Sequence, residues 1–342
     1  MKASFLRLML CFGLILGLFG FPLQKGNAQE VAQAEDLLAL MTPAEKVGQL
    51  FLITFDGTEV RDINSIYNLI TNYHVGGVVL SAAHNNFIDD SPAAWQLVQT
   101  LQEVNWQKSN PLLTDAPADP NNNYIPLYIG MNLVQGDNRT PQLLSGLTEY
   151  PSPMSLGATW SPELALEVGN VVGQELSALG VNLLLGPSLD VVDSKDMVAA
   201  TNVGTQSFGG DPYWVGEMGK AYVEGVHIGS QGRMSVIAQH FPGLGSVDRP
   251  PNEEVSTVQK TLEQLKQIEL APYMSVVGDE NPQRQVDGLM ISAIRFQGFQ
   301  GNIRATTMPV NFDQTALAQL LSPELLATWR ANGGLTISDS LG

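Results

Sequence analysis

The sequence is poor in cysteine and in positive charge, and each shortage limits what the protein can do. Cys11 is the single cysteine, and it lies in an apolar N-terminal segment. If that segment is removed, the remaining chain has no disulfides and no thiol chemistry. Lysine and arginine number 17 against 34 acidic residues, for a net charge of −17. This balance argues against nucleic acid or an anionic membrane as the main partner, because basic patches supply most of that affinity.

Motifs for metals, phosphates and serine nucleophiles are also missing. The four histidines show no i, i+4 pairing and no cysteine company, so we expect no metal site; they are His74, His84, His227 and His240. Glycine is too sparse in the stretches 209–212 and 242–245 for a phosphate cradle. No Gly-x-Ser-x-Gly occurs either. We therefore expect a protein without cofactor or metal.

The first 28 residues have the pattern of a signal peptide. Lys2 and Arg7 precede an apolar run from Leu8 to Phe21, and small residues follow at 26–28. The run is shorter than the ~20 residues of a spanning helix. A retained membrane anchor is the alternative. We expect cleavage after Ala28, one mature domain over residues 29–342, no membrane contact after cleavage, and a secreted or extracytoplasmic location.

Apolar strand-like runs alternate with helical segments along the rest of the chain. The runs are mostly continuous rather than alternating, as strands buried on both faces should be. The predicted strands are 49–55, 77–81, 126–131, 181–185, 234–239, 288–294 and 334–338. Helices are predicted at 63–73, 93–108, 162–179, 213–227, 262–277 and 314–329. This alternation is typical of an α/β fold with a parallel sheet.

The number of strands leaves two architectures open. A TIM-type (β/α)8 barrel needs eight strands and carries its reactive groups at their C-terminal ends, whereas an open sheet is complete with fewer. As a barrel, the chain is truncated after the seventh strand, so either the natural polypeptide continues or the sequence is a fragment. Unpaired strand edges would then meet water. We therefore expect residues 29–342 alone to be aggregation-prone and inactive.

Seven stretches, in order, carry a resemblance to a known family. They are LMTPAEKVGQLF (40–51), HVGGVVL (74–80), YPSPMSLGATW (150–160), LGVNLLLGPSLDV (179–191), VGTQSFGGDPYWV (203–215), AQHFPGLG (238–245) and LTISDSLG (335–342). Together they resemble the N-terminal domain of glycoside hydrolase family 3, which includes β-N-acetylglucosaminidases and β-glucosidases. The resemblance covers residues 36–342. It implies a barrel and a carbohydrate substrate.

The resemblance also implies a retaining mechanism with one carboxylate nucleophile and one proton donor. The family nucleophile is the aspartate of a Ser-Asp at the end of the seventh strand, which is Asp339 here. A strand end directs this carboxylate into the mouth of the barrel, where it can attack an anomeric carbon. The alternative is that Asp339 only caps a following helix.

The loop AQHFPGLGSVDRPPNEEV (238–255) departs from the family pattern. The hexosaminidase branch typically has Lys-His-Phe-Pro-Gly-His-Gly and then Asp-Ser-His, whose histidine is the proton donor. His240 remains, but Gln239 replaces the lysine, Leu244 replaces the second histidine, and Asp-Arg-Pro (248–250) replaces Asp-Ser-His. Asp248 is our candidate donor, with Glu253 and Glu254 as alternatives, because a carboxyl with a raised pKa can also protonate a leaving oxygen. The competing interpretation is that all three are solvated loop charges.

Five polar positions of the family are softened or lost: Asn132, Gln206, Gln239, Leu244 and Ala293. The candidate substrate-binding residues are Asn132, Arg139, Asp190, Gln206, Gln239 and His240. Structural roles are the alternatives for Asp190 as a strand-end carboxylate and for His240 as a core histidine. Three tryptophans, at 160, 214 and 329, could stack on sugars, although burial is the expected default.

Two hypotheses follow from this site. The first is a secreted retaining β-glycosidase, β-N-acetylhexosaminidase-like or β-glucosidase-like. The second is a catalytically degenerate carbohydrate-binding or structural module of the same fold.

Overall fold

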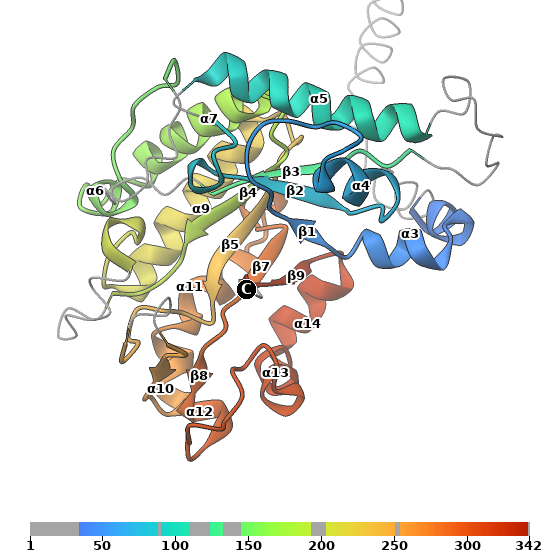
Figure 1. The fold of residues 1–342 in the computed structure, drawn as a ribbon. Helices are drawn as coiled ribbons and strands as arrows, with labels where there is room; N and C mark the ends of the chain where they lie inside the picture. The colour runs from blue at the N-terminus through green and yellow to red at the C-terminus, as the bar shows by residue number, and fades with distance from the viewer. Residues whose placement is uncertain are drawn as a thin grey trace, which may run out of the picture.

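The computed structural model describes residues 34–87, 90–109, 124–132, 145–192, 203–249 and 254–340. The predicted signal peptide lies outside these residues. Seven parallel strands form one sheet whose spatial order follows the chain (Figure 1). The strands are β1 (Leu52–Ile53), β2 (Gly77–Leu80), β3 (Tyr128–Met131), β4 (Leu183–Ser188), β5 (Ser235–Phe241), β7 (Gly288–Ile291) and β9 (Leu335–Ser338).

Helices lie around the outside of the curled sheet (Figure 1). They include α3 (Pro43–Gly48), α4 (Ser65–Thr71), α5 (Ser91–Ser109), α6 (Pro153–Gly157), α7 (Pro162–Ala178), α9 (Pro212–Gly229), α10 (Leu262–Gln267), α11 (Leu270–Val277), α12 (Gln297–Gln300), α13 (Gln314–Leu320) and α14 (Glu324–Ala331). Strand, helix and parallel strand repeat in the way of a (β/α)8 barrel, with β1 and β9 at the two edges. The fold prediction of an incomplete barrel is therefore confirmed.

Local sequence explains most of these elements. All seven predicted strands are present, and β7 is buried along its whole length, as its continuous apolar run predicts. Thr42 and Glu45 form a reciprocal capping box at the start of α3. The α7 helix begins after the Ser161 cap. It is followed by Gly180 in a left-handed conformation at φ +87°, which favours glycine.

Two long helices predicted from the sequence are each broken in the structure. The segment predicted as helix 262–277 divides into α10 and α11, because Ile268 leaves helical geometry with ψ −75°. The segment predicted as helix 314–329 divides into α13 and α14 just before Pro323, which disfavours helical geometry in the residue before it. Two strands of two residues each were not predicted, β6 (Thr257–Val258) and β8 (Arg295–Phe296). They pair in parallel outside the main sheet and are too short to show a pattern.

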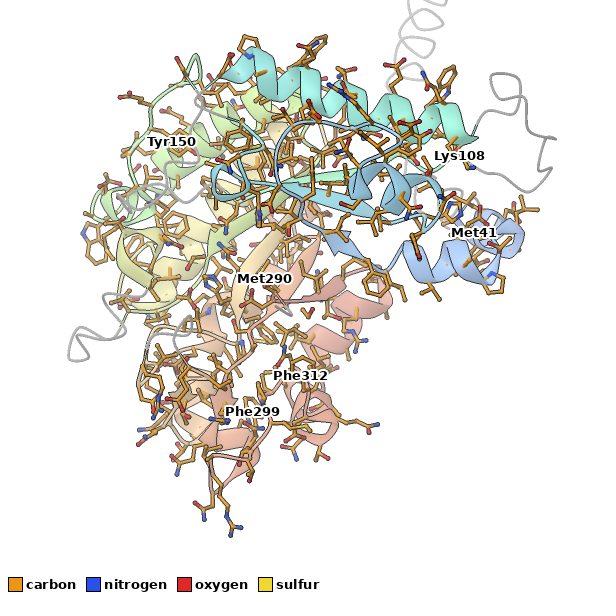
Figure 2. The ribbon with its side chains drawn as sticks, viewed as in Figure 1. Met41, Lys108, Tyr150, Met290, Phe299 and Phe312 are labelled. Carbon is orange, nitrogen blue, oxygen red and sulfur yellow. The ribbon has the colours of Figure 1, made fainter. Side chains whose placement is uncertain are left out.

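The curled sheet separates two apolar cores. The larger core lies between the sheet and the helices. The smaller core fills the inside of the sheet with Leu183, Leu185, Ile237 and Met290. Figure 2 shows Met290 at the centre of the molecule. Successive side chains of one strand alternate between the two cores. Because the strands are parallel, their carboxyl ends lie at the same edge of the sheet, around the inner core.

Candidate active site

Six of the predicted site residues gather at the carboxyl ends of four strands. We call them the strand-end cluster: Asn132, Asp190, Gln206, Gln239, His240 and Asp339. Asn132 follows β3, Asp190 follows β4, and Asp339 follows β9, while Gln239 and His240 belong to β5. Gln206 ends the short 3-10 helix η3 (Gly204–Gln206), which follows β4. Parallel strands end at one edge of a sheet, so residues far apart in sequence meet there.

Asp190 is the buried centre of the cluster, with an exposed fraction of 0%. Its Oδ2 atom accepts a hydrogen bond from the Ser188 hydroxyl at 2.7 Å and lies 2.8 Å from His240 Nδ1. Its Oδ1 atom accepts the main-chain N–H of Leu244 at 2.5 Å. A buried carboxylate needs such partners, since an unpaired buried charge is strongly unfavourable. Asp190 therefore fixes the orientation of the imidazole.

The electrostatics of His240 favour its charged form. Burial lowers the pKa of His240. The charge of Asp190 and its hydrogen bond raise the pKa by more than burial lowers it, and the charge of Asp339 adds to the rise. The net result is a His240 pKa above its ordinary value. The structure thus pairs the His240 imidazole with a buried carboxylate, and the charge of Asp339, which we predict as nucleophile, adds to the rise of the His240 pKa.

Asp339 is held by its main chain at the end of β9. Its N–H donates to the carbonyl of Ile291 on the neighbouring β7 strand at 2.9 Å. Its Oδ1 atom accepts the N–H of Ser340 at 2.8 Å. Strand pairing therefore fixes the main-chain position from which the Asp339 side chain extends. No helix follows Asp339 among the described residues.

Amide side chains form the other half of the cluster. Gln239 Nε2 donates to Asn132 Oδ1 at 3.4 Å. Gln206 and Gln239 line the same small cavity of about 30 Å³, together with Ser188. This half of the cluster is polar but uncharged, as the sequence predicts. Amides can bind hydroxyl groups, with weaker bonds than charged groups make.

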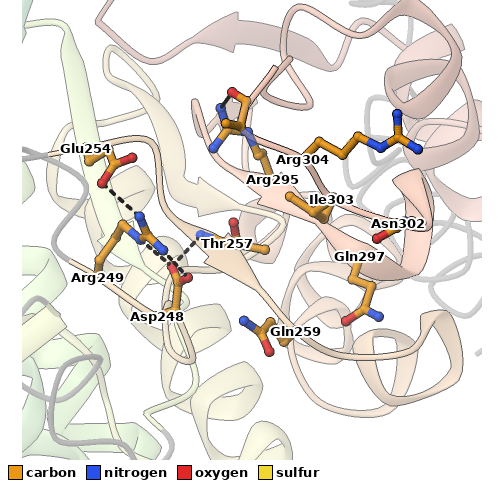
Figure 3. Close-up of a pocket in the computed structure, with 11 residues that line it drawn as sticks. Asp248, Arg249, Glu254, Thr257, Gln259, Arg295, Gln297, Asn302, Ile303 and Arg304 are labelled. Carbon is orange, nitrogen blue, oxygen red and sulfur yellow. Dashed lines mark hydrogen bonds and ion pairs between the residues drawn. The ribbon is translucent and has the colours of Figure 1, made fainter. Parts of the chain in front are cut away.

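Asp248, the candidate proton donor, lies in a different pocket (Figure 3). Its carboxylate accepts two hydrogen bonds from the Arg249 guanidinium at 3.0 and 3.2 Å, and one from Thr257 N–H at 2.7 Å. Arg249 also contacts Glu254 at 2.7 Å. The pocket measures about 410 Å³, and its lining includes none of the strand-end cluster. Arg139 and Glu253 lie outside the described residues, so their predicted roles stay predictions.

Two contacts in the site were not predicted. Ser188 supplies a hydroxyl to Asp190, and the signal for it was the Ser-x-Asp spacing at the strand end. Leu244 was interpreted as a lost polar group, yet its main-chain N–H binds Asp190 whatever its side chain is. No side-chain pattern could have predicted that contact.

The tryptophans divide between core and surface. Trp329 is buried, as expected, and its indole N–H donates to Val286 O at 2.9 Å. Trp160 is 58% exposed, so the expectation of burial is wrong for it. The reason lies in its place on the link between α6 and α7, where its ring meets Trp214 edge to face at 5.1 Å.

Two features are absent from the described residues. No three of their His, Cys, Asp and Glu side chains are grouped so as to hold a metal ion. Within the same ranges, no helix is both long and apolar enough to cross a membrane.

A family comparison identifies the domain. The sequence model described as the Glycosyl hydrolase family 3 N terminal domain matches residues 42–342. The chain belongs to this family. The family 3 domain thus spans nearly all of the chain that follows the predicted signal peptide.

Known relatives agree with this membership. The chain is 28% identical over 311 residues to a β-N-acetylglucosaminidase/β-glucosidase of Cellulomonas fimi, covering 91% of this chain and 48% of the relative. It is 31% identical over 227 residues to a β-hexosaminidase of Thiobacillus denitrificans, covering 65% of this chain and 54% of the relative. The chain therefore spans about half the length of these curated relatives.

Solved structures share the fold. A family 3 β-N-acetylglucosaminidase from a Paenibacillus species superposes with a TM-score of 0.71 at 28% identity, covering 88% of this chain and 49% of the other. A β-N-acetylhexosaminidase from Beutenbergia cavernae gives a TM-score of 0.68 at 21% identity, covering 88% of this chain and 79% of the other. The second likeness shows the fold alone.

Proposed function

We propose that the protein is a secreted, retaining β-glycosidase that removes terminal β-linked sugars. β-N-acetylhexosaminides are the first substrate class and β-glucosides the second. One observation carries the proposal: Asp339 lies at a strand end close enough to raise the pKa of His240, which is itself bound to the buried Asp190. The names of the relatives support the substrate class, and the proposed signal peptide, residues 1–28, supports secretion.

In the proposed mechanism Asp339 is the nucleophile. Its carboxylate attacks the anomeric carbon, and the bond to the leaving oxygen breaks as an ester between sugar and Asp339 forms. Water then gives one proton to the deprotonated donor and attacks the same carbon, which releases Asp339 and restores the original configuration. A protonated His240 places positive charge beside Asp339, which favours the ionised form that attacks. The amide side chains of the cluster, Asn132, Gln206 and Gln239, bind the hydroxyl groups of the sugar.

The proton donor in this proposal is Asp248. Protonation of the leaving oxygen needs an acid near the nucleophile, and where that acid is a carboxyl group the two carboxyls of a retaining enzyme lie about 5–5.5 Å apart. Asp248 is held by Arg249 and Thr257, so the donor role requires that these hydrogen bonds be exchanged when substrate binds. Replacing Asp248 with Asn should therefore slow substrates with poor leaving groups much more than nitrophenyl glycosides, which leave without a proton.

Asp339→Asn in the full-length protein tests the proposal. With nitrophenyl N-acetylglucosaminide and glucoside as substrates, we expect loss of turnover of every substrate that the wild type cleaves. Asp56→Asn is the matched control, because Asp56 is an exposed aspartate paired only with His84 among its recorded contacts. For Asp339→Gly, azide should restore turnover and yield a glycosyl azide. Unchanged activity of Asp339→Asn would contradict the nucleophile role.

A second candidate function is a carbohydrate-binding module that does not catalyse. The uncharged half of the cluster favours it, since Asn132, Gln206 and Gln239 stand where the family has charged side chains. A concave polar site can hold a sugar without cleaving it. Calorimetry with N-acetylglucosamine and glucose separates the two functions. Binding without turnover supports the module, and turnover above the uncatalysed rate rules it out.

A further inference from the structure

Glu269 is a buried carboxylate that no part of the proposed mechanism uses. It lies at the break between α10 and α11 and has an exposed fraction of 0%. Its Oε1 atom accepts a hydrogen bond from the Ser246 hydroxyl at 2.8 Å and contacts the Lys260 ammonium. Its Oε2 atom has no partner among the described residues. Glu269 therefore adds a side-chain link between the chain after β5 and the chain after β6, which also meet through a bridge between Val247 and Val258.

The chain after β5 rests directly on this side chain. We call residues 242–248 the β5 loop. Gly243 has φ +135°, and a Cβ atom built on it would lie 3.1 Å from both Cβ and Cγ of Glu269. One residue further on, Leu244 donates its N–H to Asp190 Oδ1. The β5 loop is thus held from the helix side by Glu269 and from the barrel side by Asp190.

We propose that Glu269 is a positioning residue for the Asp190–His240 pair. Lys260 holds Glu269, and Glu269 holds Gly243 and Ser246 of the β5 loop. The loop then keeps the N–H of Leu244 on one oxygen of Asp190, which leaves the other oxygen for His240 Nδ1. The contacts of Glu269, which does not touch the imidazole itself, thereby set the orientation and charge of His240.

The chemistry of Glu269 fits this role better than a purely structural one. A buried ion pair is often no more stabilising than apolar side chains of similar volume, because both charges lose their hydration. The Lys260–Glu269 pair therefore adds little to the free energy of unfolding beyond what apolar packing would supply. What it adds is two directional contacts of Glu269, one with Ser246 and one with Lys260. Tyr273 on α11 faces the same region: burial raises its pKa well above the ordinary value, with the charges of Asp190 and Glu269 adding to the rise. Its hydroxyl is therefore neutral, and Lys260 supplies the positive charge that balances Glu269.

The first test measures His240 directly and does not depend on activity. We follow the imidazole C–H signals of the full-length protein by NMR while the pH is changed, with His240→Asn to assign the signal. In Glu269→Gln the titration midpoint of His240 should move toward the ordinary value of ~6.5. His227 is the internal control, because its partners are Asp287 and the carbonyl of Gln283. An unchanged His240 midpoint in a folded Glu269→Gln protein would overturn the proposal.

Matched variants separate positioning from folding. Glu263→Gln removes an exposed carboxylate of α10 whose recorded contact is Gln267, and it should leave the His240 midpoint unchanged. Ser246→Ala deletes only the hydrogen bond from the loop to Glu269 and keeps the ion pair with Lys260. It should shift the midpoint in the same direction as Glu269→Gln. If Glu269→Gln does not fold, the Ser246→Ala result decides the question.

The second test rests on the proposed function and uses kinetics. Displacement of the pair should lower kcat by about tenfold to a hundredfold, with a smaller change in KM, since small misplacements near a reacting centre have effects of this size. Glu269→Asp, which keeps the charge, should recover part of the loss. A wild type without turnover would contradict the proposed function and leave the NMR result standing. Normal kcat in a Glu269→Gln protein with a shifted His240 midpoint would contradict the positioning role.

Discussion

The Nδ1 atom of His240 lies 2.8 Å from Oδ2 of Asp190, across 50 residues of sequence. Asp190 has no exposed surface, and its carboxylate also accepts hydrogen bonds from the Ser188 hydroxyl and the Leu244 N–H. The carboxylate is therefore fully committed to holding its neighbours. Of the two partners, the half-buried imidazole is the one positioned to meet a substrate.

Stability should depend on pH through two histidines. The pKa of His227 is raised because the hydrogen bond and charge of Asp287 outweigh burial, and the pKa of His240 is raised by Asp190 in the same way. A raised folded-state pKa adds stability that is fully present below the unfolded value of ~6.5 and is lost as the pH rises through the folded value. The free energy of unfolding in urea should therefore fall from about pH 6 toward higher pH. His227→Gln and His240→Gln should each flatten that fall, and a curve that both variants leave unchanged would contradict the assignment.

Acid should destabilise the protein through Asp313, which caps the start of helix α13. The pKa of Asp313 is lowered by hydrogen bonds from Gln300 and from the N–H groups of Ala316 and Thr315 at the start of α13. A lowered pKa adds stability that is present above the unfolded value and is lost as the pH falls through the folded value. In Asp313→Ala, the loss of stability on acidification should be smaller than in the wild type. Urea unfolding at about pH 3 and pH 6 checks this, and equal losses in both proteins would count against the cap.

Asp190→Asn should be destabilising and should change His240. The amide removes the negative charge from a fully buried site next to an imidazole, and breaking a buried pair in this way costs about 3–5 kcal/mol. The same change should lower the pKa of His240, because its main source of positive shift is gone. Chemical denaturation and NMR titration measure the two effects. An Asp190→Asn variant that is as stable as the wild type and keeps the same His240 pKa would show that the pair determines neither the stability nor the charge of His240.

Gly245→Ala should displace the β5 loop. A Cβ atom at this position would lie 1.7 Å from the carbonyl oxygen of Val191, so main chain has to move. We expect a loss of about 1–3 kcal/mol, as for other overpacked sites, together with a shift in the His240 signals. Gly216→Ala in helix α9 is the matched control, since its new Cβ would lie 3.2 Å from the side chain of Ser275 in helix α11. Equal effects of the two substitutions on stability would contradict the close contact between Gly245 of the β5 loop and the main chain of Val191, which follows β4.

Tyr273→Phe should leave stability unchanged or slightly increased. The Tyr273 hydroxyl is buried without a hydrogen-bond partner among the described residues, while its ring packs edge to face on Phe241 at 5.1 Å. Removing an unpartnered buried hydroxyl restores about 1–3 kcal/mol of desolvation cost at most, and phenylalanine keeps the ring contact. Thermal unfolding of the two proteins tests this. A loss of more than about 1 kcal/mol would mean that the hydroxyl is bonded in solution.

The strands, their parallel order and the strand-end position of Asp339 can be predicted from the amino-acid sequence. Continuous apolar runs such as Gly288–Ile291 can be recognised locally because a strand buried on both faces has no polar side. The cap at Ser161 and the stop at Gly180 are equally local, since both depend on the geometry of a single turn. The motif order that resembles family 3 was also visible without a structure.

Which of the candidate residues lie together depends on the tertiary structure. The pairing of Asp190 with His240, the contact of Leu244 N–H with Asp190, and the place of Glu269 beneath the β5 loop each join separate segments of the chain. The break between α10 and α11 is likewise not visible in the apolar pattern of 262–277, and Glu269 at this break contacts Ser246 and Lys260. Asp248 was separated from the cluster by its bonds to Arg249 and Thr257. Residue type and spacing cannot predict these contacts, because they depend on how the strand ends converge once the sheet has curled.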